Sequence, residues 1–130
     1  MSPTFRQLCP HQDVQSESAS SLELWYERIQ DTPIDVLPIG DLCRACRQDL
    51  FPAQVLPVAI ARLMEDPTAG NLYDGELAVA VSGAAHGACR TGAIAPDLCI
   101  KALEFAVPTL DAEQRAEVES VLAGLKAMQG

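Results

Sequence analysis

The cysteines and histidines are the residues whose types and spacing could support chemistry. Cys43 and Cys46 are separated by two residues, and His86 and Cys89 repeat that spacing further along the chain. Thiols and imidazoles at this spacing are common in zinc and redox sites. However, Cys43 and Cys46 fall on the apolar stripe of a predicted helix, and His86 and Cys89 lie in a glycine-rich segment. We therefore predict that Cys43 and Cys46 are small core residues and that the protein uses no metal or other cofactor.

Catalytic constellations of other kinds are not evident in the sequence. Only His11 and His86 could serve as an imidazole base, and neither lies in a recognisable nucleophile turn. No phosphate-binding glycine loop, His-Glu-x-x-His motif or dinucleotide fingerprint occurs. We therefore expect a protein that is not an enzyme and acts by binding a partner.

The composition limits the kinds of partner. Nine Lys and Arg against eighteen Asp and Glu give a formal net charge of −9. This charge repels phosphate backbones and anionic lipids, so we expect no nucleic acid and no membrane as partner and favour a basic protein. The sequence shows neither an apolar run long enough to span a membrane nor a signal-peptide core, which predicts a cytoplasmic location.

Hydrophobic periodicity predicts an all-α fold, a single compact irregular bundle of about six helices. The length of 130 residues with 48% hydrophobic residues suits one core. We expect a flexible N-terminal arm over residues 1–19 and one α-helical domain over residues 20–130. The predicted helices cover residues 21–30, 39–50, 55–64, 76–81, 96–106 and 112–128.

Three of these helices carry predicted capping residues, and one segment is ambiguous. Ser20 followed by Glu23 is a capping-box pattern at the start of the first helix, and Asp74 and Asp111 are placed to cap the helices that follow them. The run ELAVAVS at 76–82 could instead form a strand, because its apolar residues alternate. Glycines among small residues predict a loop over residues 83–95.

Residues 24–82 contain four distinctive pieces: Trp25-Tyr26, the block GDLCRACRQ at 40–48, Leu-Pro at 56–57 and DPTAGNLYDGEL at 66–77. On these pieces the segment resembles the immunity proteins of bacterial contact-dependent growth inhibition (CDI) systems. The resemblance implies a cytoplasmic antidote that binds the toxic C-terminal domain of a large secreted effector, often a nuclease. It also implies that the antidote blocks its toxin stoichiometrically, here as a 1:1 heterodimer.

Unbalanced acidic residues form our candidate contact surface for such a toxin. The first group lies in or next to the first helix and the second group follows the third helix; together they comprise Glu23, Glu27, Asp31, Asp35, Asp66, Asp74 and Glu76. Any of these acids could instead only solubilise a helix face. Two other functions stay open: a small α-helical adaptor or regulatory protein unrelated to toxins, and a zinc-dependent or thiol-based enzyme.

Overall fold

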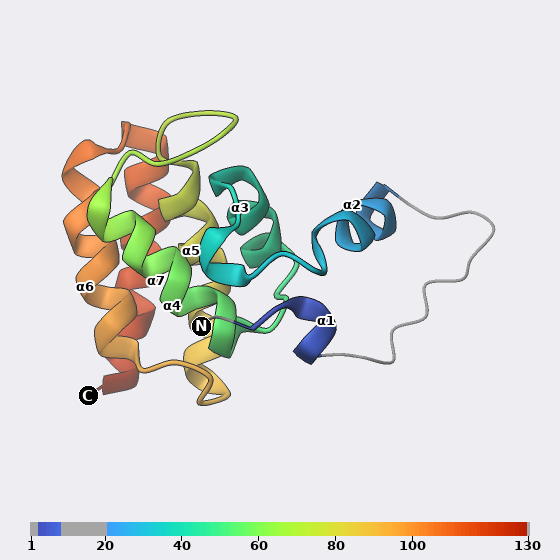
Figure 1. Ribbon diagram of the computed structural model, residues 1–130. Helices are drawn as coiled ribbons and strands as arrows, with labels where there is room; N and C mark the ends of the chain where they lie inside the picture. Colours follow the sequence, from blue (N-terminus) through green and yellow to red (C-terminus); the bar gives the residue numbers. More distant parts are fainter. Residues whose placement is uncertain (1–2, 9–20, 130) are drawn as a thin grey trace. The chain divides into compact units, whose positions relative to one another are not determined.

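The computed structural model describes residues 3–8 and 21–129, with side chains given for 24–128 in the second range (Figure 1). In these residues the chain forms seven α-helices and two short 3-10 helices, with no strand. The predicted all-α fold is therefore confirmed. Within the same residues, no helix has both the length and the apolar character needed to cross a membrane.

The chain separates into two compact units, residues 1–38 and 39–130. The first unit contains α1 (Phe5–Leu8), α2 (Ser21–Ile29) and the 3-10 helix η1 (Ile34–Val36). Helix α2 matches the predicted first helix, whereas α1 and η1 were not predicted. The boundary that the sequence suggested, between residues 19 and 20, lies outside the described residues.

Aromatic and backbone contacts connect the elements of the first unit. The rings of Phe5 and Tyr26 stack with their centroids 5.7 Å apart. The Arg6 N–H donates to the Gln30 carbonyl at 3.0 Å, next to the end of α2. Trp25, Tyr26 and Ile29 are all buried, as expected from the hydrophobic periodicity on which the helix over residues 21–30 was predicted.

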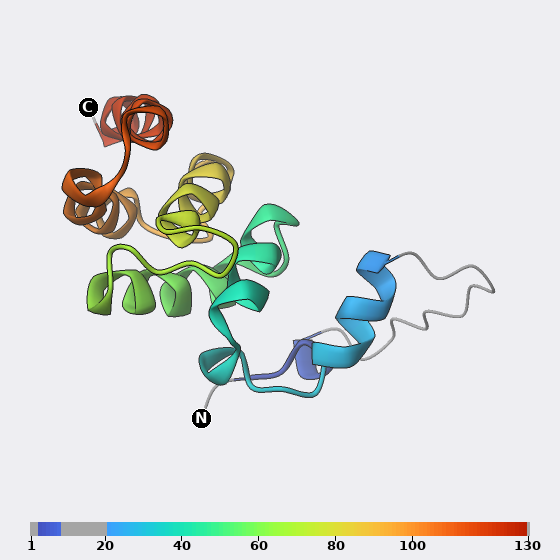
Figure 2. The same cartoon turned by 90° about the horizontal axis from the view of Figure 1, so that it is seen from above.

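The second unit is a bundle in which one helix contacts all the others. It contains α3 (Ile39–Arg47), α4 (Pro52–Glu65), α5 (Glu76–Arg90), α6 (Pro96–Ala106), the 3-10 helix η2 (Val107–Thr109) and α7 (Ala112–Gln129). Helix α5 packs against α3, α4, α6 and α7, as Figures 1 and 2 show from two directions. The core of the unit therefore forms around α5.

Helix α5 corrects two sequence predictions. It runs without interruption for 15 residues, whereas we predicted a short helix over 76–81, or a strand, followed by a loop over 83–95. Its buried face is built mainly from alanines, which let neighbouring helices approach closely. Gly83 and Gly87 lie on its exposed side, where they do not interrupt packing. Tertiary contacts thus outweigh the low helix propensity of the two glycines.

The caps predicted at Asp111 and Asp74 have different outcomes, and Ser20, the third predicted cap, lies outside the described residues. The Gln114 N–H donates to Asp111 Oδ1 at 2.8 Å, so Asp111 caps α7 as predicted. Asp74 does not cap α5, because the N-cap residue is Gly75, with φ of +89° and no side-chain cap. Glycine adopts this left-handed conformation without steric cost, so the chain can enter α5 through a tight turn.

Candidate functional site

The cysteine pair that could have supported chemistry is part of the core. Cys43 and Cys46 on α3 are 0% and 3% exposed, which confirms their assignment as packing residues. Burial is the main cause that raises the pKa of each thiol to about 12, so both stay protonated at neutral pH. His86 is exposed and Cys89 is half-buried, both on α5. Among residues 3–8 and 24–128, no three or more His, Cys, Asp or Glu side chains come together as possible metal ligands.

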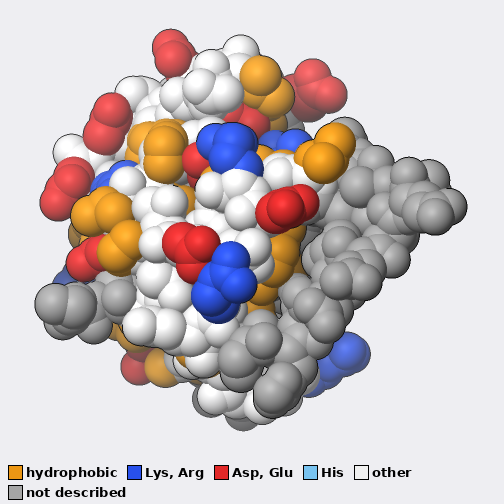
Figure 3. Space-filling view, turned by 45° about the vertical axis from the view of Figure 1, so that its right-hand side comes forward, with side chains coloured by type: hydrophobic (Ala, Val, Ile, Leu, Met, Phe, Trp, Pro, Cys, Tyr) orange, Lys and Arg blue, Asp and Glu red, His pale blue; other side chains and the backbone are white. Residues whose placement is uncertain are grey.

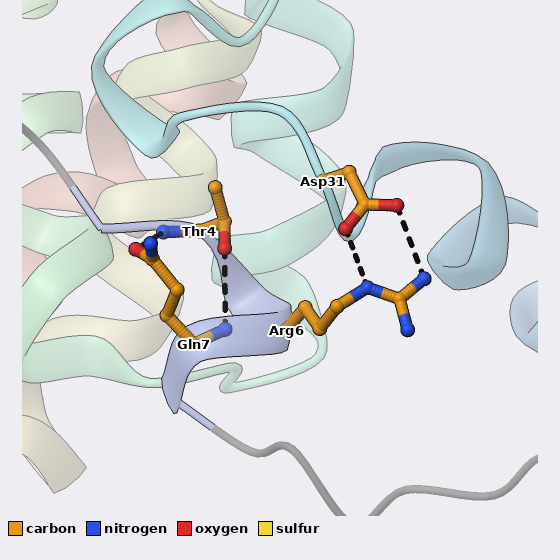
Figure 4. A network of polar contacts seen from close by, with 4 residues as sticks. All are labelled: Thr4, Arg6, Gln7 and Asp31. Carbon is orange, nitrogen blue, oxygen red and sulfur yellow. Dashed lines mark hydrogen bonds and ion pairs between the residues drawn. The ribbon is translucent and has the colours of Figure 1, made fainter.

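The candidate acids of the first unit lie on its surface. Glu27, Asp31 and Asp35 are exposed, and the side chain of Glu23 is outside the described residues. Asp31 forms a two-pronged ion pair with Arg6, with Nη2 and Oδ2 3.0 Å apart (Figure 4). The hydrogen bond from Arg6 lowers the pKa of Asp31. The negative charge of this face is therefore partly offset by a cation that sequence spacing did not reveal.

The acids of the second unit lie in or directly after the loop between α4 and α5, residues 66–75, here called the α4–α5 loop. Asp66 Oδ1 accepts hydrogen bonds from the Thr68 N–H at 3.0 Å and from its hydroxyl at 2.7 Å. The Gly75 N–H donates to the Thr68 carbonyl at 2.9 Å, and the Leu77 N–H donates to the Ala69 carbonyl at 3.0 Å. These bonds fold the first half of the loop back onto the start of α5.

Glu76 holds the second half of the same loop. Its side chain is 1% exposed, and Oε1 accepts hydrogen bonds from the N–H groups of Asn71 at 2.8 Å and Leu72 at 2.9 Å. Oε2 pairs with Arg47 Nη1 of α3 at 2.8 Å. Burial on its own would raise the pKa of Glu76, but the hydrogen bonds from the loop and from Arg47 outweigh burial and lower it. Glu76 is thus an internal anchor of the α4–α5 loop, whereas the sequence suggested a surface acid.

The loop is packed so closely at Gly70 and Gly75 that a side chain at either position would collide with neighbouring atoms. A Cβ at Gly70 would lie 2.0 Å from the Tyr73 carbonyl oxygen, so only glycine fits there. At Gly75, a Cβ would lie 2.8 Å from Oε1 of Gln114. Gln114 also donates from Nε2 to the Asp74 carbonyl at 3.1 Å, which ties the loop to α7. The loop is therefore held by α3, α5 and α7 together.

The fixed loop exposes apolar side chains that the sequence interpretation missed, because it considered acids alone. Leu72 is 74% exposed and Tyr73 is 46% exposed, while Asp66 and Asp74 are exposed on either side of them. The signal in the sequence was an apolar pair inside the polar run GNLYDG. On the face drawn in Figure 3, exposed hydrophobic side chains are scattered among acidic and basic ones. A rigid loop with an apolar tip and acidic flanks is suited to binding another protein.

The structure thus defines an all-α protein with an ordered, partly apolar α4–α5 loop at its surface, and the comparison with known families identifies its kind. Over residues 9–91 the chain matches the family of CDI immunity proteins. The chain belongs to this family, and its function is immunity against a CDI toxin. A search among curated proteins gives no match.

The matched span covers part of the structure. It contains α2 to α5 and the whole α4–α5 loop, whereas α6 and α7 lie beyond it. The resemblance seen over residues 24–82 is confirmed. Family membership favours the immunity function over that of an adaptor or regulatory protein unrelated to toxins.

Proposed function

We propose that this protein neutralises its cognate CDI toxin by binding the toxic domain in a 1:1 complex, without modifying it chemically. The match to CDI immunity proteins over residues 9–91 carries the proposal. The fixed α4–α5 loop supports it, because a surface ordered before binding loses little conformational entropy on association. Inhibition by occupancy requires one molecule of this protein for each molecule of toxin.

The partner in this proposal is the C-terminal domain of a large secreted effector, and that domain is a basic nuclease acting in the cytoplasm. A nuclease needs Lys and Arg to hold phosphates, and a protein of net charge −9 presents a complementary field. Six of the candidate acids are proposed as direct contacts or as charges at the rim: Glu23, Glu27, Asp31, Asp35, Asp66 and Asp74. Glu76 contributes indirectly by holding the α4–α5 loop.

Co-expression with the cognate toxin domain tests this proposal. Cells that produce the toxin domain alone should lose nucleic acid integrity and stop growing, and cells that also produce this protein should keep growing. Native mass spectrometry of the purified pair should give the summed mass of one copy of each, with the mass of the toxin unchanged after separation. Protection without a complex, or a toxin of altered mass, would contradict the binding mechanism.

A further inference from the structure

We propose that Leu72 and Tyr73, at the tip of the α4–α5 loop, are the anchor residues of the toxin interface. They would enter an apolar pocket on the toxin domain that is bordered by Lys and Arg side chains. This inference rests on the proposed function and specifies which part of the second unit makes the central contact.

Leu72 and Tyr73 expose much of their apolar surface to solvent. Leu72, at 74%, is more exposed than the other large hydrophobic side chains identified at the surface of the described residues. Tyr73 beside it is 46% exposed, although the unit buries a large apolar core. Burying such side chains on binding removes apolar surface from water, and tyrosines are enriched among residues that dominate interface energetics.

Hydrogen bonds hold the backbone of the loop on both sides of Leu72 and Tyr73. The Leu72 N–H is bonded to Glu76 Oε1 at 2.9 Å, and Glu76 is in turn bound to Arg47 of α3. The Asp74 carbonyl on the other side of the tip accepts a hydrogen bond from Gln114 of α7. The tip is therefore held on both sides before any partner arrives, which reduces the entropic cost of binding.

The charged side chains around Leu72 and Tyr73 favour a basic partner. In residues 64–75 the charged side chains are Glu65, Asp66 and Asp74, and all three are acidic and exposed. The nearby cation Arg47 is paired with Glu76. The pKa of Tyr73 is raised first by partial burial and then by the charge of Glu76, and these effects outweigh the opposing charge of Arg47. Basic groups around an apolar pocket complement this surface, whereas a second copy of this acidic chain would repel it.

The test compares Leu72→Ala and Tyr73→Ala with Leu98→Ala as a matched control. Leu98 is 50% exposed in the first turn of α6. Helix α6 runs along the unit, and its first turn lies at the end away from the α4–α5 loop (Figure 1). Binding of the purified cognate toxin domain is measured by calorimetry. We expect Kd to rise by about 30-fold or more for Tyr73→Ala and about tenfold for Leu72→Ala. Leu98→Ala should change it by less than about threefold.

Circular dichroism and the melting temperature of each free variant establish that it remains folded. Unchanged toxin affinity in both loop variants, while the parent protein binds tightly, would overturn the anchor role and leave the proposed function intact. A change in self-association in place of toxin affinity would assign the tip to a second copy and also overturn it. If the parent protein itself failed to bind the toxin domain, the proposed function and this inference would both be wrong.

Discussion

Removing the Glu76 carboxylate should destabilise the protein far more than removing an exposed glutamate. In Glu76→Ala, the N–H groups of Asn71 and Leu72 lose their acceptor, and Arg47 loses its partner. Each part-buried N–H left without an acceptor costs about 1–3 kcal/mol. Arg47 is 44% exposed and can be rehydrated, so its loss adds little. We expect the free energy of unfolding to fall by about 3–4 kcal/mol.

Urea denaturation at pH 7, followed by circular dichroism, measures this change. Glu119→Ala on α7 is the matched control, because Glu119 is exposed, and it should change stability by less than about 0.5 kcal/mol. Glu76→Gln keeps an acceptor oxygen for the loop and should lose about 1–2 kcal/mol. If Glu76→Ala cost no more than Glu119→Ala, Glu76 would not hold the loop, and the account of a fixed α4–α5 loop would be refuted.

The same carboxylate predicts a pH dependence. The pKa of Glu76 is lower in the folded protein than its ordinary value of 4.5, because the hydrogen bonds that favour the charged form outweigh burial. Its contribution to stability is therefore present above the unfolded-state value of about 4.5 and is lost as the pH falls through the folded-state pKa. We expect the parent protein to lose stability on acidification below pH 5 more steeply than Glu76→Gln. If the free energies of unfolding of the parent protein and Glu76→Gln fell in parallel with pH, Glu76 would not contribute to this loss.

Three further predictions concern the first unit and the thiols. Trp25→Ala should lower the free energy of unfolding by about 3–5 kcal/mol, because Trp25 is 5% exposed; an unchanged melting temperature would contradict this. Cys43→Ser with Cys46→Ser should lower the melting temperature and leave metal content and toxin affinity unchanged, so stoichiometric zinc lost on substitution would contradict the packing role. Reversing the charges of Glu27 and Asp35 should slow toxin association more than it speeds dissociation. If stopped-flow measurements gave the variant the same association and dissociation rates as the parent protein, these two acids would not belong to the interface.

Much of the fold could be predicted from the sequence because apolar periodicity is a local signal. The stripes of α2, α3 and α6 and the Asp111 cap of α7 all follow from neighbouring residues. Helix α5 could not be predicted in full, because the local signal of Gly83 and Gly87 is overridden by packing against four other helices. Helix α1 is too short to carry a periodic pattern, and its Phe5 is buried through non-local contacts such as the stack on Tyr26.

The candidate site was predictable only in part. The sequence showed two groups of acidic residues, in residues 23–35 and 66–76, but it did not show that Glu76 would be buried. That burial depends on Arg47, which lies 29 residues earlier in the chain, and on the fold of the α4–α5 loop. Leu72 and Tyr73 were missed because a short apolar pair in a loop has no periodicity. Their exposure follows from how Glu76 and Gln114 hold the loop backbone.

Titration of toxin activity tests the central claim most directly. The purified cognate toxin domain is held at a concentration well above the expected Kd, and its residual activity is measured as this protein is added. Stoichiometric neutralisation predicts a linear fall that reaches zero at one equivalent, with activity restored when the complex is dissociated. Complete inactivation by a small fraction of an equivalent, or activity that persists with several equivalents present, would contradict the account.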